Sequence, residues 1–184
     1  LNFCATAAPM PLAAPDALDR LIMLTAPSKT FNIAGNHDGN VIIQDSALRA
    51  KFSETMLGLG VSATLYGTAM TAAAYSPEGA VWVDELREYI AENARVFDEG
   101  VNAIPGLKSM SMQSTYLAWV DFSGTGMDMS EVRDRVLKQA KIAPNDGPTF
   151  GSGGESFLRF NLGTQRARVE EAVSRLQSAF ADLQ

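Results

Sequence analysis

The sequence predicts an α/β chain in which a long helix joins two bodies, and three observations lead to this prediction. Two short apolar runs, 21–25 and 40–43, have the length and the flanking residues of strands that are buried on both faces of a parallel or mixed sheet. Apolar residues then recur at helical spacing over residues 76–104. The remainder follows the order strand, strand, helix, strand, strand, helix, which is typical of a compact α+β unit.

The first body is expected to begin with a surface linker. Prolines at positions 9, 11 and 15 disfavour a regular helix or a central strand. After the second strand, Asp45 or Ser46 is expected to cap a helix that continues to about Met56. Residues 58–75 are rich in small side chains and show no clean period, so the sequence predicts no element there.

The long helix has a strong start signal. Ser76 supplies a capping hydroxyl, Pro77 occupies the first helical position and Glu78 places an acid in the first turn. A helix from there to Ile104 would be about 40 Å long at 1.5 Å per residue, enough to connect two bodies. We therefore expect three parts, residues 1–76, 77–104 and 105–184.

The last part should contain four strands and two helices. Ser130 and Thr164 are the expected N-caps of the helices, and the second helix carries apolar residues at alternating spacings of four and three. The strands are expected at four places along the chain: 108–112, 116–122, 142–144 and 157–161.

Composition excludes several classes of protein. The 184 residues carry a net charge of −6 with no basic stripe, which argues against a nucleic-acid partner. One cysteine and one histidine can form neither an internal disulfide nor a Cys/His zinc site, so no metal is expected. No apolar run approaches the ~20 residues of a membrane helix, and we expect no membrane partner. His37 is interpreted as a solvated turn residue among Asn, Asp and Gly.

Two basic residues are candidates for chemistry. Lys29 directly follows the first strand, where ligands bind in open α/β sheets; it is either a partly buried nucleophilic amine or an ordinary solvated side chain. Arg159 lies on the last strand with Phe157 and Asn161 on one face, and it is either paired within the fold or available to a carboxylate. The loop 151–154 lacks the features of a phosphate-binding loop.

Three segments, in this order, resemble one enzyme family. They are Ala-Pro-Ser-Lys-Thr-Phe-Asn-Ile-Ala-Gly (26–35), Gln-Ser-Thr-Tyr-Leu-Ala-Trp-Val-Asp (113–121) and Gly-Glu-Ser-Phe-Leu-Arg-Phe-Asn (154–161). The chain resembles the class I/II aminotransferase superfamily, fold type I of the pyridoxal-phosphate enzymes, and within it the cystathionine β-lyase-like (C–S lyase) subgroup. The implied fold class is α/β: a remnant of the large cofactor-binding domain with its mixed sheet in 1–76, a connecting interdomain helix in 77–104, and a small α+β C-terminal domain in 105–184.

The resemblance also implies roles for individual residues. Lys29 would attach pyridoxal 5'-phosphate and move the Cα proton, and Ser28 would donate a hydrogen bond to the cofactor phosphate. Arg159 would bind the substrate α-carboxylate, with Asn161 and the loop 151–154 lining the mouth of the site. The segment 62–66 resembles one that approaches the cofactor of a neighbouring subunit. The resemblance therefore implies a cytoplasmic homodimer that acts on an amino acid, as a C–S β-lyase or an aminotransferase.

Two departures from the family pattern support an alternative. Gly35 is followed by Asn-His-Asp instead of Leu, which removes one expected phosphate contact. The family's N-terminal half, with its glycine-rich loop, its ring-stacking aromatic and its aspartate for the ring nitrogen, has no counterpart in these residues. We expect the chain to be the C-terminal part of a longer enzyme. The alternative is a non-catalytic remnant or interaction module that no longer binds cofactor.

Overall fold

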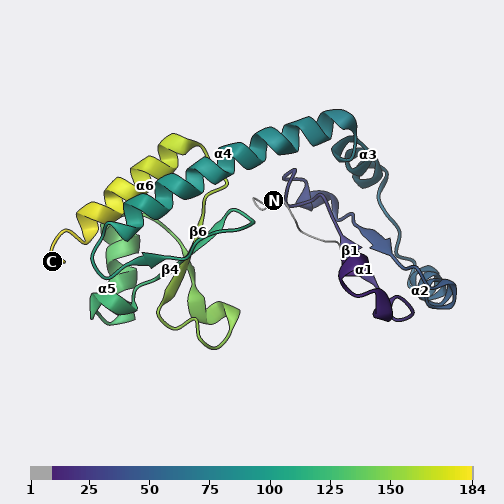
Figure 1. Ribbon diagram of the computed structural model, residues 1–184, viewed down its shortest axis with the longest axis horizontal. Coiled ribbons are helices and arrows are strands. Elements are labelled where there is room, and N and C mark those ends of the chain that lie inside the picture. The colour runs from purple at the N-terminus through teal and green to yellow at the C-terminus, as the bar shows by residue number, and fades with distance from the viewer. Residues whose placement is uncertain (1–9, 184) are drawn as a thin grey trace. The chain divides into compact units, whose positions relative to one another are not determined.

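The computed structural model describes residues 10–183, and the chain divides into two compact units between Glu85 and Leu86. We call residues 10–85 the N-terminal unit and residues 86–183 the C-terminal unit; Figure 1 labels the α-helices and the strands β1, β4 and β6. The elements that lie wholly in the N-terminal unit are α1 (Met10–Ala13), η1 (Pro15–Ala17), β1 (Met23–Thr25), η2 (Ala34–Asn36), β2 (Asn40–Ile42), α2 (Ser46–Gly58) and α3 (Leu65–Ala74).

The two predicted strands of the N-terminal unit are present, but their predicted burial is wrong. β1 and β2 form an antiparallel pair in which Met23 lies opposite Ile42. Leu24 is 70% exposed and Val41 is 41% exposed. Apolar runs predict which side chains a strand can bury, whereas burial itself needs layers packed on both faces, and this sheet is only two strands wide.

The helices of the N-terminal unit confirm one expectation and correct two. Asp45 caps α2 by accepting a hydrogen bond from the Leu48 amide at 2.7 Å, as predicted. α3 was not predicted, because it buries only a glycine and an alanine and therefore shows no apolar stripe. α1 contradicts the prediction of no helix near the prolines: Pro11 is its second residue, where the helix has no acceptor for an N–H group. Residues 1–9 of the predicted linker lie outside the described residues.

The predicted long helix is present as α4 (Pro77–Asn102). The Ser76 hydroxyl accepts a hydrogen bond from the Gly79 amide at 3.1 Å, so the predicted cap is confirmed. The helix ends two residues before Ile104. The division between the two units falls inside α4, after its ninth residue. No helix in the described range 10–183 is both long and apolar enough to cross a membrane.

The C-terminal unit confirms the predicted order of elements. Its sheet has the strand order β3-β4-β6-β5, with every neighbouring pair antiparallel. The strand predicted at 142–144 is instead the two-residue β5, three positions later, because Asn145 pairs with Arg159 of β6. The elements after α4 are β3 (Lys108–Ser109), β4 (Leu117–Asp121), η3 (Ser123–Thr125), α5 (Met129–Asp134), the π-helix η4 (Arg135–Gln139), β5 (Asn145–Asp146), η5 (Gly147–Phe150), β6 (Phe157–Asn161) and α6 (Arg166–Ala179).

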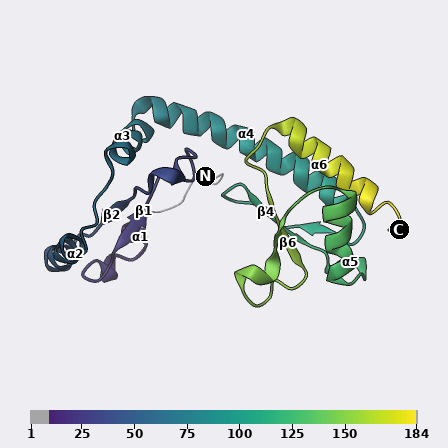
Figure 2. The same cartoon turned by 180° about the vertical axis from the view of Figure 1, so that it is seen from behind.

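One face of this sheet forms the core. The alternating side chains of β4 and β6 are buried there beneath α4, α5 and α6, which lie on the same side of the sheet (Figure 2). Phe97 of α4 is 1% exposed, and its ring centroid lies 5.4 Å from that of Phe160. The predicted stripe of α6 is confirmed, since its apolar residues belong to this core. The opposite face of the sheet carries Arg159.

Both predicted caps in this unit are wrong by one or two residues. Asp128, not Ser130, is the N-cap of α5, and its carboxylate accepts from the Ser130 amide at 3.3 Å. Gln165, not Thr164, precedes α6 and makes no side-chain cap. The first amide of α6, on Arg166, instead donates to the Tyr89 hydroxyl of α4 at 2.7 Å. A tertiary acceptor therefore replaces the local cap that the sequence suggested.

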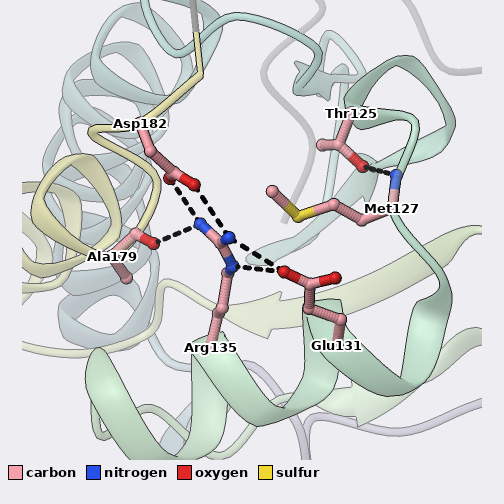
Figure 3. A network of polar contacts seen from close by, with 6 residues as sticks. All are labelled: Thr125, Met127, Glu131, Arg135, Ala179 and Asp182. Atoms are coloured by element: carbon pink, nitrogen blue, oxygen red, sulfur yellow. Dashed lines mark hydrogen bonds and ion pairs between the residues drawn. The ribbon is translucent and has the colours of Figure 1, made fainter.

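Arg135 ties the end of α6 to the π-helix (Figure 3). Its guanidinium pairs with Glu131 one turn earlier and with Asp182 beyond α6, and it donates to the Ala179 carbonyl at 3.2 Å. It also lies 5.7 Å from the centroid of the Phe180 ring. Hydrogen bonds from Arg135 lower the pKa of the Asp182 carboxyl below its ordinary value of 3.8.

Replacing Arg135 with methionine should therefore lower the thermal midpoint of the C-terminal unit, and the loss should depend on pH. A depressed carboxyl pKa contributes stability above the unfolded pKa, and this contribution disappears as pH falls through the folded one. The difference between wild type and Arg135→Met should thus be full at pH 6 and shrink as the pH falls below 3.8. Thermal unfolding from pH 7 to pH 2.5 measures it, and a pH-independent difference would contradict the role of Asp182.

Candidate functional site

The candidate lysine lies in a tight turn that follows β1. The Phe31 amide donates to the Pro27 carbonyl and the Ile33 amide donates to the Ser28 carbonyl, both at 2.9 Å. Asn32 closes the turn with a left-handed φ of 54°. The backbone thus folds once around Ser28 and Lys29 and presents them side by side.

The polar atoms of Ser28 and Lys29 are available to a ligand. Lys29 is exposed and Ser28 is half-buried. Neither the ammonium of Lys29 nor the hydroxyl of Ser28 forms an ion pair or a hydrogen bond with another described residue. The predicted position of Lys29 after a strand is confirmed. The partial burial expected for a nucleophilic amine is not observed, because Lys29 is exposed.

A groove of about 380 Å³ lies beside this turn within the N-terminal unit. Pro27, Thr30 and Phe31 line it from the turn, and residues 74–76 together with part of α4 line it from the other side. Phe31 stacks on Trp82 of α4, with ring centroids 5.0 Å apart. Lys29 itself does not line the groove, although Pro27 and Thr30 of the same turn do.

His37 does not join this turn. It follows η2 with a left-handed φ of 51° and is exposed, which confirms the interpretation as a turn residue. The neighbouring Asp38 accepts a hydrogen bond from the Thr71 hydroxyl at 2.6 Å. No three His, Cys, Asp or Glu side chains in residues 10–183 gather closely enough to hold a metal ion.

Arg159 is positioned by β6 on the sheet face opposite the core. Leu158 and Phe160 point into the core, so the alternation of the strand sends Arg159 to the other side, as the sequence predicted. The register places Trp119 of β4 on one side of Arg159 and Asn145 of β5 on the other. Neither of these two neighbours was identified from the sequence.

The guanidinium of Arg159 is held by an amide and an aromatic ring. Its Nη2 donates to the Asn145 side-chain oxygen at 3.0 Å, and its central carbon lies 4.2 Å from the centroid of the Phe150 ring. Its Nε is buried and has no hydrogen-bond partner among the described residues. Since buried N–H donors are nearly always satisfied in native proteins, this donor indicates a missing acceptor. No described carboxylate pairs with Arg159, so the cation is available to an anion.

Asn161 and the loop 151–154 flank this arginine more loosely. Asn161 is exposed and accepts a hydrogen bond from the Gly163 amide at 2.8 Å, which leaves its amide nitrogen available. The loop is anchored at Gly154, which packs directly against Gly147. A side-chain carbon added at Gly147 would lie 2.0 Å from the Gly154 carbonyl oxygen, so both positions require glycine.

The structure thus brings the candidates together in two pairs. Ser28 and Lys29 share a turn of the N-terminal unit, and Arg159 and Asn161 share a strand face of the C-terminal unit. The residues missed by sequence reasoning are Asn145, Trp119 and Phe150. The alternation of β4 was a signal that could have placed Trp119 on the sheet face that carries Arg159. No local signal pointed to Phe150, which precedes β6 by seven positions.

Comparisons with known proteins converge on one family. The sequence profile of the family described as aminotransferase class I and II matches residues 3–176. The chain is 38% identical to cystathionine beta-lyase PatB of Bacillus subtilis, over 90% of this chain and 43% of that protein. It is 34% identical to protein MalY of Escherichia coli, over 85% of this chain and 41% of that protein.

Solved structures give the same result. Cystalysin from Treponema denticola, which contains a pyridoxal 5'-phosphate cofactor, matches with a TM-score of 0.89 and 30% identity, over 100% of this chain and 47% of that one. A putative PLP-dependent beta-cystathionase from Corynebacterium diphtheriae matches with a TM-score of 0.88 and 31% identity, over 98% and 48%. The chain therefore spans less than half the length of the relatives it matches.

Proposed function

Because this chain belongs to the class I and II aminotransferase family, we propose that it supplies the lysine turn and the carboxylate-binding strand of a pyridoxal-phosphate enzyme acting on amino acids. The observation that carries the proposal is the guanidinium of Arg159, which pairs with no described acid and has two nitrogens, Nη1 and Nε, without a described acceptor. A carboxylate is the planar anion that fits such a fork of donors.

The residues of the lysine turn suit the cofactor. When bound, pyridoxal 5'-phosphate supplies an electron sink for carbanion chemistry at Cα. The Lys29 amine would attach the cofactor and afterwards carry the Cα proton, and no described acid engages this amine. The hydroxyl of Ser28, equally unengaged, would donate to the phosphate. Arg159 would fix the substrate through its carboxylate and so determine which bond at Cα reacts, with Asn161 beside it.

Among the reactions of this family we favour β-elimination at a carbon–sulfur bond. The support is that two relatives bear the names cystathionine beta-lyase and beta-cystathionase. An aspartate aminotransferase of Pyrococcus horikoshii is also similar, at 25% identity, so transamination is the competing activity. Both reactions begin with removal of the Cα proton, and they differ in whether a β-substituent leaves or the proton returns at the cofactor.

The assembly follows from the same proposal. Residues 1–76 would belong to the cofactor-binding domain, residues 77–104 would form the connecting helix, and residues 105–184 would form the small domain. The working enzyme would be a cytoplasmic homodimer, with residues 62–66 of one subunit approaching the site of the other.

Cofactor trapping tests the proposal. The purified chain is mixed with pyridoxal 5'-phosphate, reduced with borohydride, digested and mapped by mass spectrometry. We expect one dominant modified peptide, carrying the phosphopyridoxyl group on Lys29. Equal labelling of all five lysines, or no labelling, would overturn the proposal and favour the non-catalytic remnant.

A further inference from the structure

We infer that Phe150 and Asn145 are positioning residues for Arg159, because together they fix its guanidinium in place without neutralising it. This inference rests on the proposed function, in which Arg159 receives the substrate carboxylate. The inference adds two residues that orient the Arg159 guanidinium and leave its charge unpaired before the substrate arrives. Neither of them touches the reacting atoms in the proposed function.

Neutral neighbours and an unpartnered donor together characterise Arg159. Four other arginines of the C-terminal unit are paired with carboxylates: Arg95, Arg133, Arg135 and Arg175. Arg166 also has neutral partners, Asn93 and Tyr89, but its Nε donates to Asn93, whereas the Nε of Arg159 has no described acceptor. Beside Arg159 the register instead places Asn145, whose neutral amide oxygen accepts one hydrogen bond. The next residue, Asp146, is an acid, but its carboxylate pairs with Arg133 at 2.7 Å. The strand β5 thus offers Arg159 an acceptor without a negative charge.

Phe150 orients the cation from another side. An aromatic face attracts a guanidinium through its quadrupole and uses none of the N–H donors, which point outward in the guanidinium plane. The ring is itself supported: it meets Trp119 edge-on at 5.7 Å, and Trp119 stacks on Phe157 at 5.2 Å with an angle of 11°. Phe150 is nevertheless 50% exposed, so burial of its own surface does not account for its position.

The backbone that carries Phe150 is also fixed. Phe150 ends η5, whose first residue is Gly147, and Gly147 packs against the backbone of Gly154 too closely for any side chain. The close contact of Gly147 with the backbone of Gly154 and Phe157 therefore fixes the segment that carries the Phe150 ring next to the start of β6. With the amide on Nη2 and the ring over the central carbon, the guanidinium keeps Nη1 as a donor that is not buried and has no partner among the described residues, and an anion can bind there.

The test observes the guanidinium of Arg159 through its Nε–H signal. In the full 184-residue chain, the Nε–H signal of Arg159 is followed by two-dimensional NMR while sodium acetate is added, and it is assigned by its loss in Arg159→Lys. Acetamide at equal ionic strength is the uncharged control. The Nε–H signal of Arg135, an arginine already paired with Asp182, reports that each variant keeps the fold of the unit.

The variants separate positioning from mere packing. We expect acetate, but not acetamide, to shift the wild-type signal saturably. Phe150→Leu should weaken acetate binding about two- to fivefold, the range of an exposed cation–π contact, and Phe150→Tyr should retain it. Asn145→Asp should shift the Arg159 signal without acetate and weaken acetate binding more than tenfold, since the new carboxylate at position 145 then pairs with the guanidinium.

The outcomes also separate this inference from the proposed function. Acetate binding that is unchanged in both Phe150→Leu and Asn145→Asp, or absent from the wild type, would overturn the inference whatever happens at Lys29. A normal acetate response together with failed cofactor trapping at Lys29 would overturn the proposed function alone.

Discussion

Replacing Lys29 with alanine is expected to abolish borohydride-stable attachment of pyridoxal 5'-phosphate. Only a primary amine condenses with the cofactor aldehyde, and Lys29 is the lysine of the turn after β1, where it follows Ser28. The expected change is from one modified site per chain to background labelling, measured by the mass of the reduced protein. Lys29→Arg, which keeps the positive charge, should lose attachment equally.

A matched control makes this result specific. Lys51 is also exposed and belongs to the same unit, on α2. Lys51→Ala should leave the attachment at Lys29 unchanged, because a substitution on α2 does not alter the turn that carries Ser28 and Lys29. If Lys29→Ala and Lys51→Ala reduced the labelling by the same small fraction, the lysine turn would lose its assigned role.

Replacing Phe97 with alanine is expected to destabilise the C-terminal unit by about 3–5 kcal/mol. Phe97 is 1% exposed and packs on Phe160, between α4 and the sheet. Its removal costs the transfer free energy of the ring and leaves a cavity that the rigid sheet cannot close. Urea unfolding monitored by the fluorescence of Trp119, in a Trp82→Phe background, measures the change.

Leu137 provides the matched control within the same unit. It is 54% exposed, and Leu137→Ala should change the free energy of unfolding by no more than about 0.5 kcal/mol. A loss at Phe97 no larger than the loss at Leu137 would mean that the core is not where the structure places it.

Periodicity predicted the elements that bury a continuous stripe or an alternating face. β6 and α6 are examples, because every second residue of β6 and one apolar stripe of α6 reach the same core. α3 has no such stripe and was missed. The position of β5 depended on its pairing with β6, and the start of α6 depended on the Tyr89 hydroxyl of α4. Contacts between distant segments leave no local signal.

In the candidate site, too, residues with a local signal were predicted and residues placed by distant contacts were not. Lys29 and Arg159 were found because each is a reactive residue at a recognisable place, after a strand and between large apolar residues. The surroundings of Arg159 were not found. Asn145 is an ordinary polar residue in a short segment, and Phe150 approaches the arginine only because two glycines bring η5 against the start of β6.

The small interior of the N-terminal unit has a thermodynamic consequence. α2 buries none of its 13 residues, and α3 buries only Gly67 and Ala74. Helices of that length are marginal in water unless a face is packed. A partner that binds only the folded N-terminal unit therefore raises its stability by mass action. At a free concentration of a hundred times the dissociation constant, the partner adds about 2.7 kcal/mol to the free energy of unfolding, which is large for a unit with so few buried side chains.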